Sequence, residues 1–93
     1  ITISERDWKI IRDLKPELLN LACEQIFHRI EKLSAAEQGN RIKLAGAYTL
    51  IQREDDKIAK MFDDLKRSNA FFKIAALRQY DVLTDAQMGL FSE

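Results

Sequence analysis

The chain has 93 residues, in which 15 Lys and Arg balance 15 Asp and Glu, and it holds one His and one Cys. A chain of this length forms one domain, which we place at residues 1–93, and folding buries roughly 60–65% of the surface of the unfolded form. Because opposite charges interleave along the sequence, no standing field attracts phosphates or anionic lipid. We therefore expect neither nucleic acid nor a membrane surface as a partner.

The chain carries no sign of export or membrane insertion. No apolar run reaches the roughly 18–20 residues of a spanning helix, and the N-terminus has no signal-peptide pattern. The single Cys23 has no partner for an internal disulfide, which is typical of a reducing compartment. The chain begins at Ile1 without an initiator Met, which indicates trimming or processing. We expect a cytoplasmic protein.

The first predicted helix begins at Ser4 and ends near Leu14. Ser4 is a typical N-cap, and Asp7 stands where the partner residue of a capping box would lie. Ile3 and Trp8 have the spacing of a hydrophobic staple, so we expect Trp8 to anchor this helix.

The second predicted helix begins at Pro16, because proline suits the first turn of a helix, and it ends between Leu33 and Ala36. Its apolar residues recur at intervals of three and four, which predicts one buried face. These residues are Leu19, Ala22, Cys23, Ile26, Phe27, Ile30 and Leu33.

The third predicted helix covers residues 41–68, after a short connection that contains Gly39 and Asn40. Its apolar residues alternate at four and three positions, a period that lets a helix lie along an antiparallel neighbour. We therefore predict a hairpin of the second and third helices. The apolar residues of the third helix are Leu44, Tyr48, Ile51, Ile58, Phe62 and Leu65.

The C-terminal third of the chain predicts two further helices. Ala70 to Tyr80 is apolar around most of its circumference, which is typical of a helix packed on several sides. Thr84 and Gln87 form a capping box at the start of a fifth helix, and we expect the natural protein to continue beyond Glu93. The sequence thus predicts an all-α fold, a small bundle of four to five helices built on the long antiparallel hairpin.

Glu54 and Asp55 interrupt the apolar stripe of the third helix. A carboxylate inside a helical interface is costly unless it is paired, so three interpretations remain. The second helix ends near this point and both acids are solvated, or they form a polar layer with Asn20, or they bind a metal or small ligand. The hairpin geometry favours the first interpretation.

No catalytic constellation is recognisable. His28 lies between Glu24 and Glu31 on one helix face, but a helical di-metal site needs two Glu-x-x-His motifs, and the chain has none. Cys23 lies on the apolar face without a histidine beside it. We therefore expect no enzyme activity, no catalytic residue, no cofactor and no metal.

The remaining feature is a surplus of apolar side chains near the C-terminus, because large exposed apolar patches mark interfaces. The predicted function is a non-catalytic protein–protein interaction module that binds itself, as a homodimer, or another protein. The alternative is a helical bundle that binds a metal or small ligand at Glu54 and Asp55. The predicted interface residues are Phe71, Phe72, Ile74, Leu77 and Phe91.

Overall fold

The computed structural model describes residues 2–91 and places them in four helices, with no strand in that range. The helices are α1 (Glu5–Ser34), α2 (Asn40–Phe62), α3 (Ala70–Gln79) and α4 (Asp85–Met88). The prediction of an all-α fold is confirmed. None of these helices is both long and apolar enough to cross a membrane.

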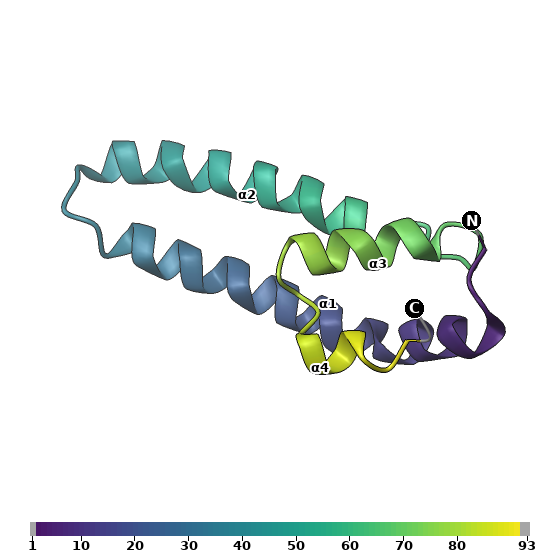
Figure 1. Cartoon of the computed structure of the whole chain (residues 1–93). Coiled ribbons are helices and arrows are strands. Elements are labelled where there is room, and N and C mark those ends of the chain that lie inside the picture. Colours follow the sequence, from purple (N-terminus) through teal and green to yellow (C-terminus); the bar gives the residue numbers. More distant parts are fainter. Residues whose placement is uncertain (1, 92–93) are drawn as a thin grey trace.

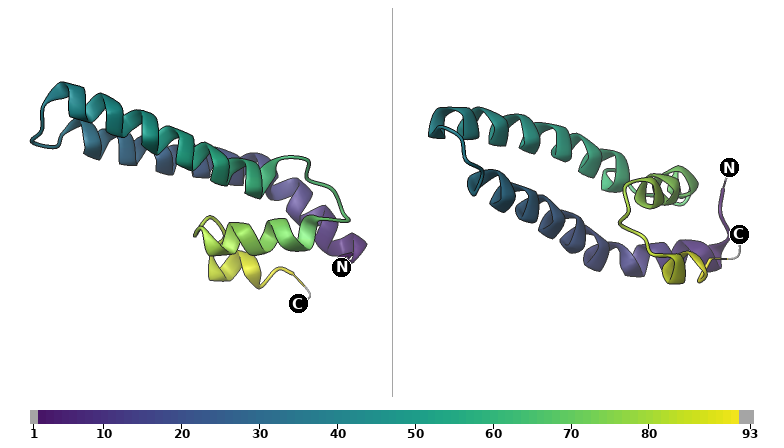
Figure 2. Two further views of the ribbon diagram at one scale, coloured as in Figure 1. Left: turned by 90° about the horizontal axis from the view of Figure 1, so that it is seen from above. Right: turned by 60° about the vertical axis from the view of Figure 1, so that its left-hand side comes forward.

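The first 30 helical residues form one continuous helix, so the predicted break between Leu14 and Pro16 is wrong. Ser4 is the N-cap, and its hydroxyl accepts a hydrogen bond from the backbone N–H of Asp7 at 3.1 Å. Pro16 lies inside α1, where it removes one backbone donor and favours a bend, and Figure 2 shows that the helix is not straight. Ile11 and Leu18, on either side of the proline, are both buried in the core. Their packing keeps the helix continuous across Pro16.

The predicted third helix is too long, because α2 ends at Phe62 instead of residue 68. Asp64 adopts a left-handed backbone conformation with φ of 54°, which a helix does not tolerate. The side chain of Asn69 then closes the turn, since it accepts from the N–H of Lys66 at 3.0 Å and donates to the carbonyl oxygen of Asp64 at 2.7 Å. Leu65 therefore follows the apolar period without being helical.

The predicted hairpin of a second and a third helix is not found as such, because the first two predicted helices form the single long helix α1. Instead, α1 and α2 run antiparallel through a connection at residues 35–39, and α3 folds back beside the C-terminal end of α2 (Figure 1). The capping box predicted at Thr84 and Gln87 is confirmed, but α4 has only four residues.

The core lies at one end of the molecule, where α1, α2 and α3 meet. Trp8, Ile74, Met88 and Phe91 are partly buried and pack against it. The fully buried apolar residues are Ile11, Leu18, Ala22, Met61, Phe62, Ala70, Leu77, Val82 and Leu83.

The other end of the molecule is a projecting pair of helices, which we call the arm and define as residues 23–53. No residue between Ala22 and Glu54 is buried. The molecule measures 51 × 23 × 18 Å, with a radius of gyration of 15.8 Å. A compact domain of this length has a radius of gyration of about 12 Å, so the arm gives the chain an elongated shape.

Candidate functional site

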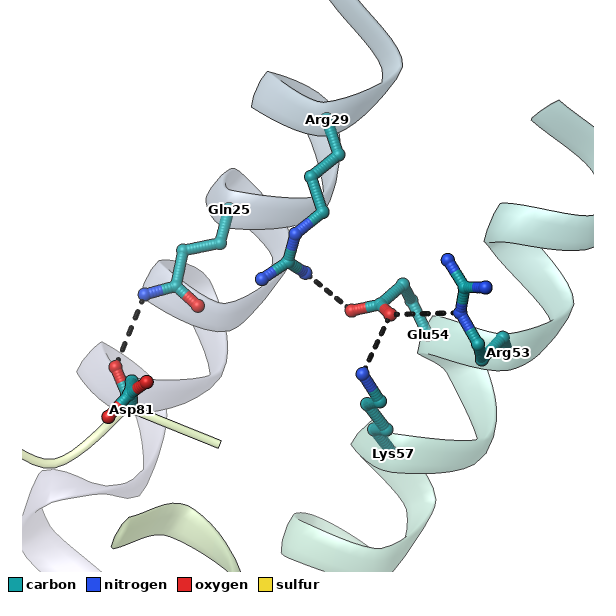
Figure 3. Close-up of polar contacts among 6 residues, drawn as sticks. All are labelled: Gln25, Arg29, Arg53, Glu54, Lys57 and Asp81. Atoms are coloured by element: carbon teal, nitrogen blue, oxygen red, sulfur yellow. Dashed lines mark hydrogen bonds and ion pairs between the residues drawn. The ribbon is translucent and has the colours of Figure 1, made fainter. Parts of the chain in front are cut away.

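Glu54 lies at the junction between the arm and the core. It is 5% exposed, and three cationic side chains surround its carboxylate (Figure 3). Arg29 of α1 donates from Nη1 to Oε1 at 2.5 Å, and Lys57 donates from Nζ to Oε2 at 3.1 Å. The Nε atom of Arg53 lies 3.7 Å from Oε2. Both carboxylate oxygens are therefore engaged.

The surroundings of Glu54 are basic, because three cations against one carboxylate leave a local charge of 3 − 1 = +2. The side chains of Arg29, Lys57 and Arg53 remain 47%, 34% and 62% exposed, so water screens these ion pairs. A divalent cation placed here would be repelled by its neighbours. The geometry does not favour the metal version of the alternative function.

The residues predicted to share a polar layer with Glu54 do not surround it. Asn20 and Asp55 are both exposed, and Arg29 takes the place opposite Glu54. The cause is the register between α1 and α2: the side chain of Leu33 lies 3.5 Å from the position of a Cβ atom on Gly46. With this contact, α2 lies more than one helical turn along α1 from a register that would place Asn20 opposite Glu54.

A pocket of about 220 Å³ opens beside Glu54, where α1, α2 and the turn after α3 meet. Arg29 and Lys57 line it, and the ammonium group of Lys57 lies 5.3 Å from the ring centroid of Tyr80. Gln25 donates from Nε2 to the backbone oxygen of Asp81 at 3.5 Å, across the mouth between α1 and this turn (Figure 3). Asp81 has a φ of 59°, a left-handed conformation that Asp adopts more readily than most residues. The apolar part of the lining is formed by Ala22, Ile26, Ile58, Met61 and Val82.

One side of the arm carries large apolar side chains in solvent. Phe27, Leu44, Tyr48 and Ile51 are 66%, 62%, 64% and 49% exposed, and we call these four residues the arm face. Leu44, Tyr48 and Ile51 had been predicted to face the second helix, and that prediction is wrong. The positions of α2 that turn toward α1 include Gly46 and Glu54 instead.

The arm face spans both helices. Successive residues of a helix are rotated by about 100° around its axis. Leu44, Tyr48 and Ile51 therefore lie together on one flank of α2, to one side of the positions that face α1. Because α1 runs in the opposite direction, the same rotation on α1 brings Phe27 to the same side of the pair. Gln25, which contacts the turn after α3, lies on the other side. The arm face therefore points away from α3.

The five predicted interface residues do not form one surface. Leu77 is 1% exposed and belongs to the core, which excludes it from an interface. Ile74 and Phe91 are partly buried against the same core. Phe71 and Phe72 are 42% and 61% exposed, and their rings touch edge to face with centroids 5.4 Å apart.

The remaining candidate residues form ordinary surface contacts. His28 pairs with Glu31 through Nδ1 and Oε1 at 3.2 Å, and both side chains are largely exposed. Cys23 is a partly buried free thiol. Within residues 2–91, no three His, Cys, Asp or Glu side chains are grouped closely enough to hold a metal ion.

The chain was compared with protein-family models, curated protein sequences and solved structures, and none of them matches it significantly.

Proposed function

We propose that the chain is a non-catalytic homodimerisation module in which two copies pair through the arm face and form a four-helix bundle. The observation that carries this proposal is the exposure of Phe27, Leu44, Tyr48 and Ile51 on one side of a two-helix layer. A helix pair with an apolar side is stabilised when a second layer covers that side. A second copy of the arm supplies such a layer.

The size of the arm face supports a specific contact. The four side chains expose roughly 500 Å² in total, which is at the upper end of the apolar patches that monomeric proteins tolerate. One partner of a standard interface contributes about 800 Å², which the polar residues around the arm face would complete. Two of the four side chains are aromatic, the type that usually dominates binding energy.

The spacing of charges supports a two-fold symmetric pairing. Arg41, Tyr48 and Asp55 are seven residues apart, so they share one position of a heptad repeat on α2. In an antiparallel pair of α2 helices with its two-fold axis at Tyr48, Arg41 of each copy lies beside Asp55 of the other. Both residues are exposed in the single chain. This pairing accounts for a carboxylate at Asp55 within an otherwise apolar stripe.

The first test compares two glutamate substitutions on opposite sides of α2. Y48E introduces like charges at the two-fold axis, so we expect the dimer dissociation constant from sedimentation velocity to rise at least ~10-fold. I42E is the matched control, because Ile42 is 61% exposed but lies on the opposite flank from Leu44. A wild-type chain that stays monomeric up to millimolar concentration would contradict the proposal, and so would equal effects of both substitutions.

The second test reverses the charges at the two ends of the arm face. R41E and D55K each place like charges together in the antiparallel pair and should weaken dimerisation by roughly 3-fold to 10-fold. The double variant R41E/D55K restores opposite charges and should recover most of the wild-type affinity. Additive weakening in the double variant would exclude the register with its axis at Tyr48.

A further inference from the structure

Two cationic side chains, Arg29 and Lys57, line the pocket beside Glu54. Arg29 carries five N–H groups and Lys57 three, and neither has an acceptor. Glu54 takes one hydrogen bond from each, so both of its oxygens have a partner. Figure 3 shows the second Nη atom of Arg29 on the side of Gln25, away from Glu54. Unused donors of two cations therefore remain at the pocket.

The charges of the pocket lining balance. Arg29 and Lys57 face the carboxylates of Glu54 and Asp81, which leaves 2 − 2 = 0, and the third cation beside Glu54, Arg53, does not line the pocket. Glu54 is 5% exposed and compensated, while Asp81 is exposed at the mouth, where water screens it. The apolar part of the lining includes the half-buried Ile26 and Ile58, whereas Met61 and Val82 are 3% and 2% exposed and offer a ligand almost no surface.

We propose that this pocket binds a small organic carboxylate, whose anionic group lies between Arg29 and Lys57 and whose short alkyl chain lies against Ile26 and Ile58. Guanidinium and ammonium groups form stronger, charge-assisted hydrogen bonds with carboxylates than neutral donors do. The volume of about 220 Å³ is below the usual range for drug-sized ligands, which limits the ligand to a few carbon atoms. In this arrangement Glu54 is a positioning residue, because it holds both cations at the pocket.

The test uses butyrate as the probe and follows the amide signals of the full chain by NMR at constant ionic strength. Saturable shifts are expected at Gln25, Lys57, Tyr80 and Val82, with acetate and inorganic phosphate binding more weakly than butyrate. Butylammonium and 1-butanol should give no saturable shifts. Shifts that fail to saturate, or that are equal for butyrate and butylammonium, would overturn the proposal. Equal affinities for acetate and butyrate would show that the alkyl chain does not contact the pocket.

The matched variants are R29Q and R53Q, because both arginines contact Glu54 but only Arg29 lines the pocket. R29Q should weaken butyrate binding at least ~10-fold, and R53Q less than ~2-fold. K57Q provides a second pocket variant if circular dichroism shows that R29Q does not fold. D81N should strengthen binding slightly, since it removes a repelling charge and Asn tolerates the left-handed backbone. Equal losses in R29Q and R53Q would overturn the site.

This inference is independent of dimerisation. The pocket borders the turn after α3, whereas the arm face lies on the opposite side of α1 and α2. Butyrate binding to a strictly monomeric chain would leave the pocket proposal standing and contradict only the homodimer.

Discussion

Glu54 is the residue on which the junction between arm and core depends. Its carboxylate is buried, while the three cations that contact it reach it from partly exposed positions. Exposed ion pairs contribute little to stability, but a buried carboxylate with charge-assisted hydrogen bonds contributes more. The strength of the junction therefore lies in the hydrogen bonds from Arg29 and Lys57, more than in the number of nearby charges.

The substitution E54A should lower the free energy of unfolding by about 1–2 kcal/mol, because the hydrogen bonds are lost while Arg29 and Lys57 regain water. The measurement is urea denaturation followed by circular dichroism. D56A is the control, since Asp56 lies two residues farther along α2 and is exposed, and it should leave the stability unchanged. Equal losses in the two variants would show that Glu54 acts only as a surface charge.

The sequence marks Glu54 as an unusual residue, but the interpretation that it favours, in which both acids are solvated, is wrong for Glu54, which is buried and paired with Arg29. An acid in an apolar helical stripe is unusual in any helix, so the sequence alone marks the position. Arg29 faces Glu54 only because Leu33 packs against Gly46 and sets the register of the two helices. That register depends on tertiary packing, which helical periodicity does not specify.

At the scale of the elements, helix starts were easier to predict than helix ends. Ser4 and Thr84 cap α1 and α4 through local hydrogen bonds that a few neighbouring residues determine. The end of α2 depends on the left-handed Asp64 and on the side chain of Asn69, and Pro16 is tolerated because the core holds both sides of α1. These outcomes depend on contacts between distant residues.

The sequence pattern also could not predict which side of α2 packs on α1. Leu44, Tyr48 and Ile51 have the period of a buried stripe, and the period says nothing about which helix covers them. Within the described chain, no helix covers them. Their regular spacing is consistent with a stripe that belongs to an interface between copies.

The cap of α1 gives a prediction at this scale. S4A removes the side-chain acceptor for the N–H of Asp7 and should lower the free energy of unfolding by about 1 kcal/mol, as measured by thermal or urea unfolding. S4D keeps an acceptor at the N-terminus of the helix and should retain the wild-type stability. If S4D is as unstable as S4A, the hydroxyl of Ser4 contributes through something other than capping.

At the scale of the whole molecule, stability is distributed unevenly. Every buried residue of α2 lies at or beyond Glu54, and the buried residues of α1 end at Ala22. The arm is held by half-buried contacts between two helices, and helical segments with so little packing are marginally stable in water. The arm should therefore open locally more often than the core does.

Amide hydrogen exchange measures this gradient and connects it to dimerisation. In dilute solution, amides at residues 44–51 should exchange at least ~10-fold faster than those at residues 58–62, because fewer buried contacts must break for the arm to open. At concentrations where the chain dimerises, covering the arm face should slow exchange at residues 44–51 while residues 58–62 change little. The Y48E variant should lack this concentration dependence. Uniform protection along α2 in the monomer would mean that the arm is stable without a second copy, and the main physical reason for pairing would disappear.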